Sequence, residues 1–162
     1  MQKVVPFLWF DKNAEEAMNF YVEIFKGSPS ENAHDSEIVE ITRYPGGFNE
    51  GPMAGMEGQV LNGTFKLGGL KLYALDGGPI FKFNESISML VECEDQAEID
   101  YFYEKLSAVP ESEICGWLKD KFGLGWQIIP KNMGELLKTK PAIEAMLKMK
   151  KINIAELEKA GA

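Results

Sequence analysis

The sequence is poor in the residues that most often bind metals or form disulfides. Its 162 residues include one histidine, His34, and two cysteines, Cys93 and Cys115. Neither cysteine belongs to a C-x-x-C pair, and two thiols are too few for a disulfide framework, which favours a reducing cytoplasm. One imidazole cannot supply a site of several histidines, so His34 is interpreted as an exposed loop residue. A histidine-rich metal site is therefore not expected.

Long apolar runs and positive charge are scarce as well. No apolar run approaches the roughly 18 residues needed to span a bilayer, and residues 1–6 lack the apolar region of a signal peptide. The formal net charge is -8, whereas a nucleic-acid surface needs clustered Lys and Arg. The Lys-rich run 148–151 is interpreted as a solvated helix end. We expect a soluble cytoplasmic protein with no nucleic acid and no membrane as partner.

Residues 115–130 contain the clearest pattern in the chain. Aromatic and aliphatic residues flank a polar segment that is followed by two glycines, which predicts a β-hairpin. In its second strand, alternation places Trp126 and Ile128 on one face and Gln127 on the other. Gln127 is therefore a polar side chain on the face opposite the buried tryptophan, and a candidate for a functional role.

The first half of the sequence predicts a strand, a helix and three further strands. Residues 4–10 form a β-rich run, after which Asn13 and Glu16 make a capping-box-like pair at the start of a helix. The later strands are expected at 36–44, 59–67 and 70–75, with Gly68 and Gly69 forming a two-residue turn. The segment 45–58, rich in Gly and Pro, is either a functional flap or a variable connection.

The pattern starts again after the Gly-rich break at 76–79. A strand at 87–91 is followed by a helix that begins at Asp95 with the same capping arrangement, and internal duplication is the better interpretation. The second copy is shorter, and C-terminal helices are expected near 135–137 and 142–159. The predicted organisation is a first βαβββ module at 1–78, a second at 79–130 and a helical extension at 131–162, which together make one domain.

The resemblance to a known family rests on several segments taken together. They are Pro6-Phe7-Leu8-Trp9-Phe10-Asp11, Phe20-Tyr21, Leu75-Asp76-Gly77-Gly78-Pro79, Phe81-Lys82-Phe83 and residues 115–127. With them the chain resembles the PhnB-like branch of the vicinal oxygen chelate superfamily, whose members include glyoxalases, bleomycin-resistance proteins and dioxygenases. Proteins of this branch are often labelled 3-demethylubiquinone-9 3-methyltransferase. The resemblance implies an α+β fold, in which paired βαβββ modules form a cupped mixed sheet over a small-molecule site, usually in a homodimer.

The resemblance also implies where a metal would bind. The superfamily holds a divalent metal with His and Glu on the strands that face the cup. Matched residue by residue, those positions fall on Pro6, Tyr73, Ser86 or Ser88, and Gln127. None of these is a good ligand for Zn²⁺, Mn²⁺ or Fe²⁺, which prefer imidazole or carboxylate. We expect no metal and no cofactor.

Strand alternation then predicts what lines the cup. If Pro6 faces it, so do Leu8 and Phe10, while Phe7 and Trp9 pack against helices. The predicted ligand-binding residues are Leu8, Phe10, Asn62, Thr64, Tyr73, Ser86, Ser88 and Gln127. Neutral hydrogen-bonding groups beside an aromatic wall suit a small polar-aromatic or amide ligand. The alternative is a filled groove whose side chains bond to one another and to water.

Three functions remain open. The first is a protein that binds an unidentified small molecule in a metal-free cup. The second is an enzyme of the superfamily, either a metalloenzyme of the glyoxalase or dioxygenase type, against which Pro6 and Gln127 argue, or a methyltransferase as the family label says. An S-adenosylmethionine site of the doubly wound kind needs a glycine-rich strand-to-helix turn, and the glycine pairs 68–69 and 77–78 lie between predicted strands. The third is an interaction module that uses Met146 and Met149. Cys115 is interpreted as a packed cysteine; a nucleophile or redox-sensitive thiol is the alternative, since Lys119 shares its strand face by parity.

Overall fold

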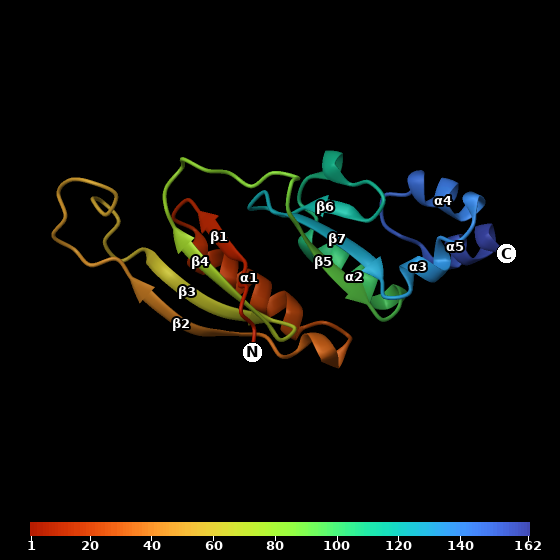
Figure 1. The fold of residues 1–162 in the computed structure, drawn as a ribbon, viewed down its shortest axis with the longest axis horizontal. Coiled ribbons are helices and arrows are strands. Elements are labelled where there is room, and N and C mark those ends of the chain that lie inside the picture. The colour runs from red at the N-terminus through yellow and green to blue at the C-terminus, as the bar shows by residue number, and fades with distance from the viewer. The chain divides into compact units, whose positions relative to one another are not determined.

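The computed structural model describes residues 1–162, which divide into two compact units, Met1–Lys82 and Phe83–Ala162 (Figure 1). Each unit contains a mixed β-sheet with a helix against one face. The predicted α+β class is confirmed. No helix combines the length and the apolar composition of a membrane span.

The first unit follows the predicted order of one strand, one helix and three strands. Its elements are β1 (Phe7–Phe10), α1 (Ala14–Lys26), the short 3₁₀ helix η1 (Glu31–Ala33), β2 (Glu37–Arg43), β3 (Val60–Leu67) and β4 (Leu70–Asp76). The strands lie in the order β1-β4-β3-β2, with β1 parallel to β4. Gly68 and Gly69 both have positive φ at the β3–β4 turn, as predicted. The segment 45–58 connects β2 to β3.

Asp76, at the end of β4, joins the first helix to the sheet. Its side chain is 1% exposed; Oδ1 accepts a hydrogen bond from the Ala14 amide at 2.9 Å, and Oδ2 accepts one from the Val60 amide at 2.9 Å. A carboxylate at the start of a helix satisfies an amide that has no partner within the helix. Asn13 occupies the N-cap position of α1, as predicted, but its side chain makes no capping hydrogen bond.

The second unit contains three strands where four were predicted. Its elements are β5 (Ser88–Cys93), α2 (Gln96–Leu106), the 3₁₀ helix η2 (Pro110–Ser112), β6 (Trp117–Lys119), β7 (Gly125–Pro130), α3 (Met133–Leu136), α4 (Lys140–Leu147) and α5 (Ile154–Gly161). The strand order is β5-β7-β6. Between α2 and β6 the chain forms η2, which begins at Pro110, and Ile114 forms only an isolated bridge with Trp117, so no fourth strand is present.

The C-terminal helix expected at 142–159 is divided into α4 and α5, which corrects the prediction. The intervening residues pack against the sheet: Ile152 is fully buried, the Met149 carbonyl accepts a hydrogen bond from the Cys115 amide at 2.8 Å, and the Lys150 carbonyl accepts one from the Gly116 amide at 2.8 Å. Asn153 then caps α5 through the Glu156 amide. Long-range hydrogen bonds thus hold this segment in a non-helical conformation.

Candidate functional site

Each sheet has one face covered by a helix and one open face. In the first unit, a Cβ on Gly63 would lie 2.6 Å from atoms of Met18, so Gly63 is directly under α1. Leu8 is in register with Ala74, which is in register with Gly63. These positions share a face, because paired residues on neighbouring strands point the same way. Leu8 therefore lies on the covered face of this sheet.

Leu8 and Phe10 are a correction to the predicted site. They are 7% and 3% exposed, and they belong to the layer between the sheet and α1. Phe7 is 52% exposed and Trp9 is partly exposed, so these two residues lie on the open face. All four residues of β1 are apolar, so polarity cannot decide which side faces the helix. The pairing with β4 decides it, because Leu72 and Ala74 are buried there.

Tyr73 lies at the centre of the open face of the first unit. Its ring meets that of Phe7 edge to face, with centroids 5.4 Å apart, and the Lys71 ammonium lies 5.6 Å from its centroid. Thr64 is in register with Tyr73, and Asn62 lies two residues before Thr64 on the same face. The structure therefore brings Asn62, Thr64 and Tyr73 to one surface, with Phe7 as the aromatic neighbour that parity had placed elsewhere.

Gln127 and Ser88 form a pair on the open face of the second unit. Gln127 Nε2 donates a hydrogen bond to Ser88 Oγ at 2.9 Å, and both side chains are half-buried. Gln127 lies between Leu90 and Trp117 in the register, while its neighbours in sequence, Trp126 and Ile128, are buried, as alternation predicted. Trp117 thus provides the aromatic surface beside the pair.

Ser86 lies outside this open face. It is exposed in the connection before β5, where its amide donates a hydrogen bond to Asn84 Oδ1 at 2.8 Å. Of the two serines that could match the ligand position, Ser88 is therefore the one beside Gln127.

Asp120 fixes the hairpin that carries Gln127. It is 1% exposed; its Oδ1 accepts hydrogen bonds from the amides of Phe122 at 2.8 Å and Leu124 at 3.1 Å, and its Oδ2 accepts one from Trp126 Nε1 at 2.8 Å. The buried indole is thereby tied to the turn that precedes its strand. This arrangement sets the register of β7 and with it the face on which Gln127 lies.

The positions matched to metal ligands lie in pairs, but their donors do not fit a transition metal. The Pro6 carbonyl accepts a hydrogen bond from the Tyr73 amide at 2.9 Å, and Ser88 contacts Gln127 as described. No group of three or more His, Cys, Asp or Glu side chains is placed to hold a metal ion. Peptide, phenol, hydroxyl and amide groups lack the imidazole and carboxylate donors that such ions prefer.

The two thiols differ in their surroundings. Cys93 is fully buried, and burial, followed by the nearby carboxylate Glu98, raises the pKa of its thiol. Cys115 has a φ of 51° in the turn before β6 and lies outside the strand, so the alternation that placed it beside Lys119 does not reach it. Lys119 forms an ion pair with Glu85 instead. The expected shared face of Cys115 and Lys119 is therefore wrong.

Comparison with known proteins places this fold in a family. The family model for 3-demethylubiquinone-9 3-methyltransferase matches residues 2–129. The chain belongs to this family. The chain is 37% identical to a solved structure described as a putative 3-demethylubiquinone-9 3-methyltransferase, PhnB protein, from Bacillus cereus, with a TM-score of 0.60 over 79% of this chain and 99% of that one. The predicted PhnB-like relationship is thereby confirmed.

A protein from Pseudomonas aeruginosa has the same fold at 20% identity, with a TM-score of 0.57 over 80% of this chain and 98% of that one. No protein with a curated functional description matches the chain. The family model ends before α3, so the helices α3, α4 and α5 lie outside it.

The residues present do not form a methyl-donor site of the doubly wound kind. The strand-to-helix connections are Asp11-Lys12-Asn13 before α1, Glu94-Asp95 before α2 and Lys131-Asn132 before α3, and none of them contains glycine. Gly68 and Gly69 form the β3–β4 turn, and Gly77 and Gly78 follow β4. The glycine-rich turn of doubly wound nucleotide-binding folds, which lets the backbone approach the cofactor, therefore has no counterpart here.

Proposed function

We propose that this PhnB-like protein binds small polar-aromatic or amide-containing molecules on the open face of each sheet, without a metal ion. The Gln127–Ser88 pair carries the proposal. Their hydrogen bond uses one amide N–H of Gln127 and one lone pair of Ser88. The carbonyl oxygen of Gln127 and the hydroxyl hydrogen of Ser88 are left to act together as acceptor and donor, which complements the N–H and C=O of an amide.

Aromatic side chains on the open face of each sheet support the same ligand class. Trp117 is in register with Gln127, and Phe7 contacts Tyr73 on the other sheet. Flat apolar surface beside a few neutral hydrogen-bonding groups is the usual composition of small-molecule sites. Asn62 and Thr64 add two neutral polar groups beside Tyr73. Methyl transfer is not part of the proposal, because the site lacks the turn that a doubly wound methyl-donor fold uses.

A thermal-shift screen of small amides and hydroxylated aromatics, run with a chelator present, tests this function. Compounds that raise the melting temperature of the wild-type protein are then titrated into the Tyr73→Ala/Ser88→Ala/Gln127→Ala variant. We expect binding to fall by at least about tenfold, as is typical when one central contact is lost. Ser86→Ala is the matched control, because Ser86 is exposed and lies outside the open face. Unchanged affinity in the triple variant would refute the assignment.

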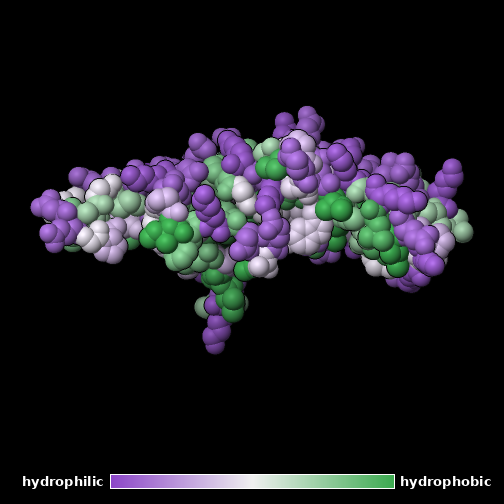
Figure 2. Space-filling view, turned by 90° about the horizontal axis from the view of Figure 1, so that it is seen from above, coloured by the Kyte–Doolittle hydropathy of each residue, from purple (hydrophilic) through white to green (hydrophobic).

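We also propose that the protein forms a homodimer and acts in the cytoplasm. Support for the dimer comes from α4, where Ile143 and Leu147 are 41% and 58% exposed. Hydrophobic side chains also interrupt the polar surface in Figure 2. Two cysteines without a disulfide fit a reducing compartment. Light scattering after size exclusion should give twice the chain mass for the wild type and less for Leu147→Asn, whereas an unchanged monomeric mass in both would refute the dimer.

A further inference from the structure

The second unit contains a pocket that adjoins the Gln127–Ser88 pair, because its lining residues Trp117 and Gly125 are in register with Gln127 and Ser88. It has a volume of about 530 Å³ and lies between the edge strand β6 and the segment around η2. Its lining residues are Glu85, Val109, Glu111, Ser112, Ile114, Trp117, Leu118, Lys119 and Gly125. Neither Gln127 nor Ser88 is among them. The volume falls within the roughly 300–1,000 Å³ of typical ligand pockets.

The pocket occupies a place where the first unit has a strand. In the first unit β2 pairs with β3, whereas β6 has no strand on its outer side. The outward backbone groups of β6 are nevertheless satisfied: the Lys119 amide donates to Ser112 Oγ at 2.9 Å, and the Lys119 carbonyl accepts from the Ala108 amide at 2.9 Å. A peptide strand therefore has no backbone ladder to join there. The pocket can recognise a compact molecule and is closed to an extended chain.

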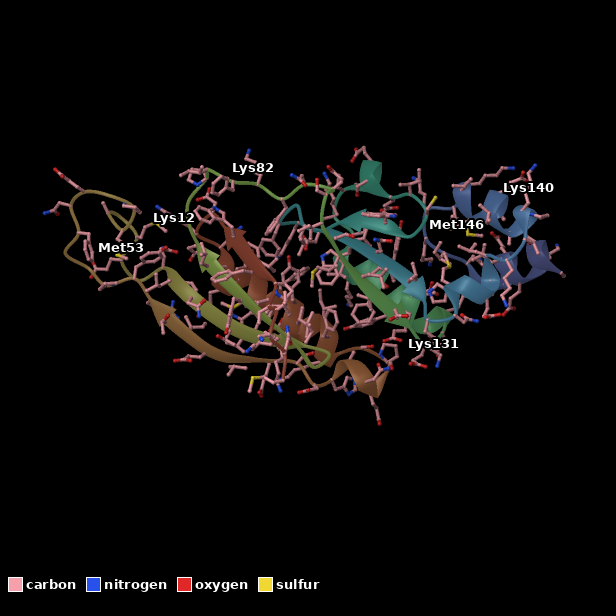
Figure 3. The ribbon with its side chains drawn as sticks, in the orientation of Figure 1. Lys12, Met53, Lys82, Lys131, Lys140 and Met146 are labelled. Carbon is pink, nitrogen blue, oxygen red and sulfur yellow. The ribbon has the colours of Figure 1, made fainter.

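The walls of the pocket are held in place before any ligand binds. Ser107 Oγ donates to Glu113 Oε1 at 2.8 Å, and Ser112 Oγ donates to the Val109 carbonyl at 2.6 Å. The carbonyls of Met149 and Lys150 hold the loop next to Ile114 through the hydrogen bonds already described. Helix α4, with Met146 (Figure 3), leads directly into that segment. A pre-formed pocket binds without a large ordering cost.

The lining determines the chemistry of the ligand. Val109, Ile114, Trp117 and Leu118 provide apolar surface, and the ring of Trp117 favours stacking with a flat molecule. The charged lining residues are two carboxylates, Glu85 and Glu111, and one ammonium, Lys119. Lys119 is paired with Glu85, so Glu111 leaves an excess of negative charge. We propose that this pocket extends the site of the proposed function, on which the inference rests, and that it is specific for uncharged, flat aromatic molecules and selective against aromatic anions.

Two fluorescent dyes with the same ring system test the proposal. N-phenyl-1-naphthylamine is uncharged, and 8-anilinonaphthalene-1-sulfonate carries a sulfonate. Titration of the wild-type protein should give saturable binding of the uncharged dye at one site, with the anionic dye at least about tenfold weaker. Equal affinity for the two dyes, or no saturable binding of the uncharged one, would overturn the proposal.

Two pairs of matched variants locate the binding. Ile114→Asn alters a pocket residue that is 57% exposed and should weaken binding of the uncharged dye by about tenfold, whereas Val39→Asn, at a residue of β2 that is 54% exposed, should not. Glu111→Lys should raise the affinity for the anionic dye several-fold. Glu104→Lys makes the same charge change at an exposed position on α2 and should leave that affinity unchanged. If both members of each pair behave alike, the dyes bind elsewhere and the proposal is wrong.

Discussion

The buried carboxylate of Asp120 should contribute more to the free energy of unfolding than a surface charge does. The Asp120→Asn variant measures part of that contribution. Asp120 Oδ1 accepts hydrogen bonds from two backbone amides, and Oδ2 accepts one from Trp126 Nε1. An asparagine can keep its oxygen on the two amides, but its NH₂ then faces the indole N–H. Loss of one hydrogen bond to a buried charge costs about 1.5–3 kcal/mol. We expect the free energy of unfolding to fall by about that amount.

A double-mutant cycle with Trp126→Phe isolates this contact. Phenylalanine removes the indole N–H, so in the Trp126→Phe background Asp120→Asn should cost about 1–2 kcal/mol less than in the wild type. Urea denaturation, followed by far-ultraviolet circular dichroism, gives the four free energies of unfolding. Coupling below about 0.5 kcal/mol would be within ordinary additivity and would refute the role given to this contact.

Three further predictions concern the covered faces and the C-terminal segment. Cys115 should react with iodoacetamide in the native protein while Cys93 stays unmodified, because burial raises the pKa of the Cys93 thiol. Mass spectrometry of the peptides measures the labelling of each thiol, and equal labelling would contradict the burial of Cys93. Ile152→Ala should lower the free energy of unfolding by about 2–5 kcal/mol in urea, and a loss below about 1 kcal/mol would mean that residues 148–153 do not pack as described. Asp76→Asn should lower the free energy of unfolding in urea by about 1.5–3 kcal/mol, because one of the two backbone amides that bond to Asp76 then faces an NH₂ group. An unchanged urea midpoint would argue that Asp76 does not link α1 to the sheet.

The sequence was most informative where alternation and turn residues agreed. The hairpin β6–β7 and the orientation of Gln127 follow from apolar residues at every second position and from Gly123, which has a φ of 88°. The β3–β4 turn follows from its two glycines for the same reason. The family resemblance left Ser86 and Ser88 open for the position beside Gln127, because one strand cannot reveal its neighbour in a sheet, and the hydrogen bond in the structure selects Ser88.

Three features could not be read from local pattern. β1 is apolar at all four positions, so the covered side of Leu8 and Phe10 depends on the register with β4. The non-helical segment 148–153 depends on hydrogen bonds to Cys115 and Gly116, which are far away in the sequence. The capping hydrogen bond of α1 comes from Asp76 in place of Asn13, again through a distant contact. In each case the deciding contact is made with a residue far away in the sequence, which local pattern does not contain.

The central claim is that neutral side chains on an open sheet face hold the ligand without a metal. Isothermal titration of the strongest amide from the screen into wild-type and Gln127→Ala protein, each with and without chelator, tests it most directly. We predict that chelator leaves the wild-type Kd unchanged and that Gln127→Ala raises the Kd by at least about tenfold. Binding that disappears with chelator, or that survives unchanged in Gln127→Ala, would contradict it.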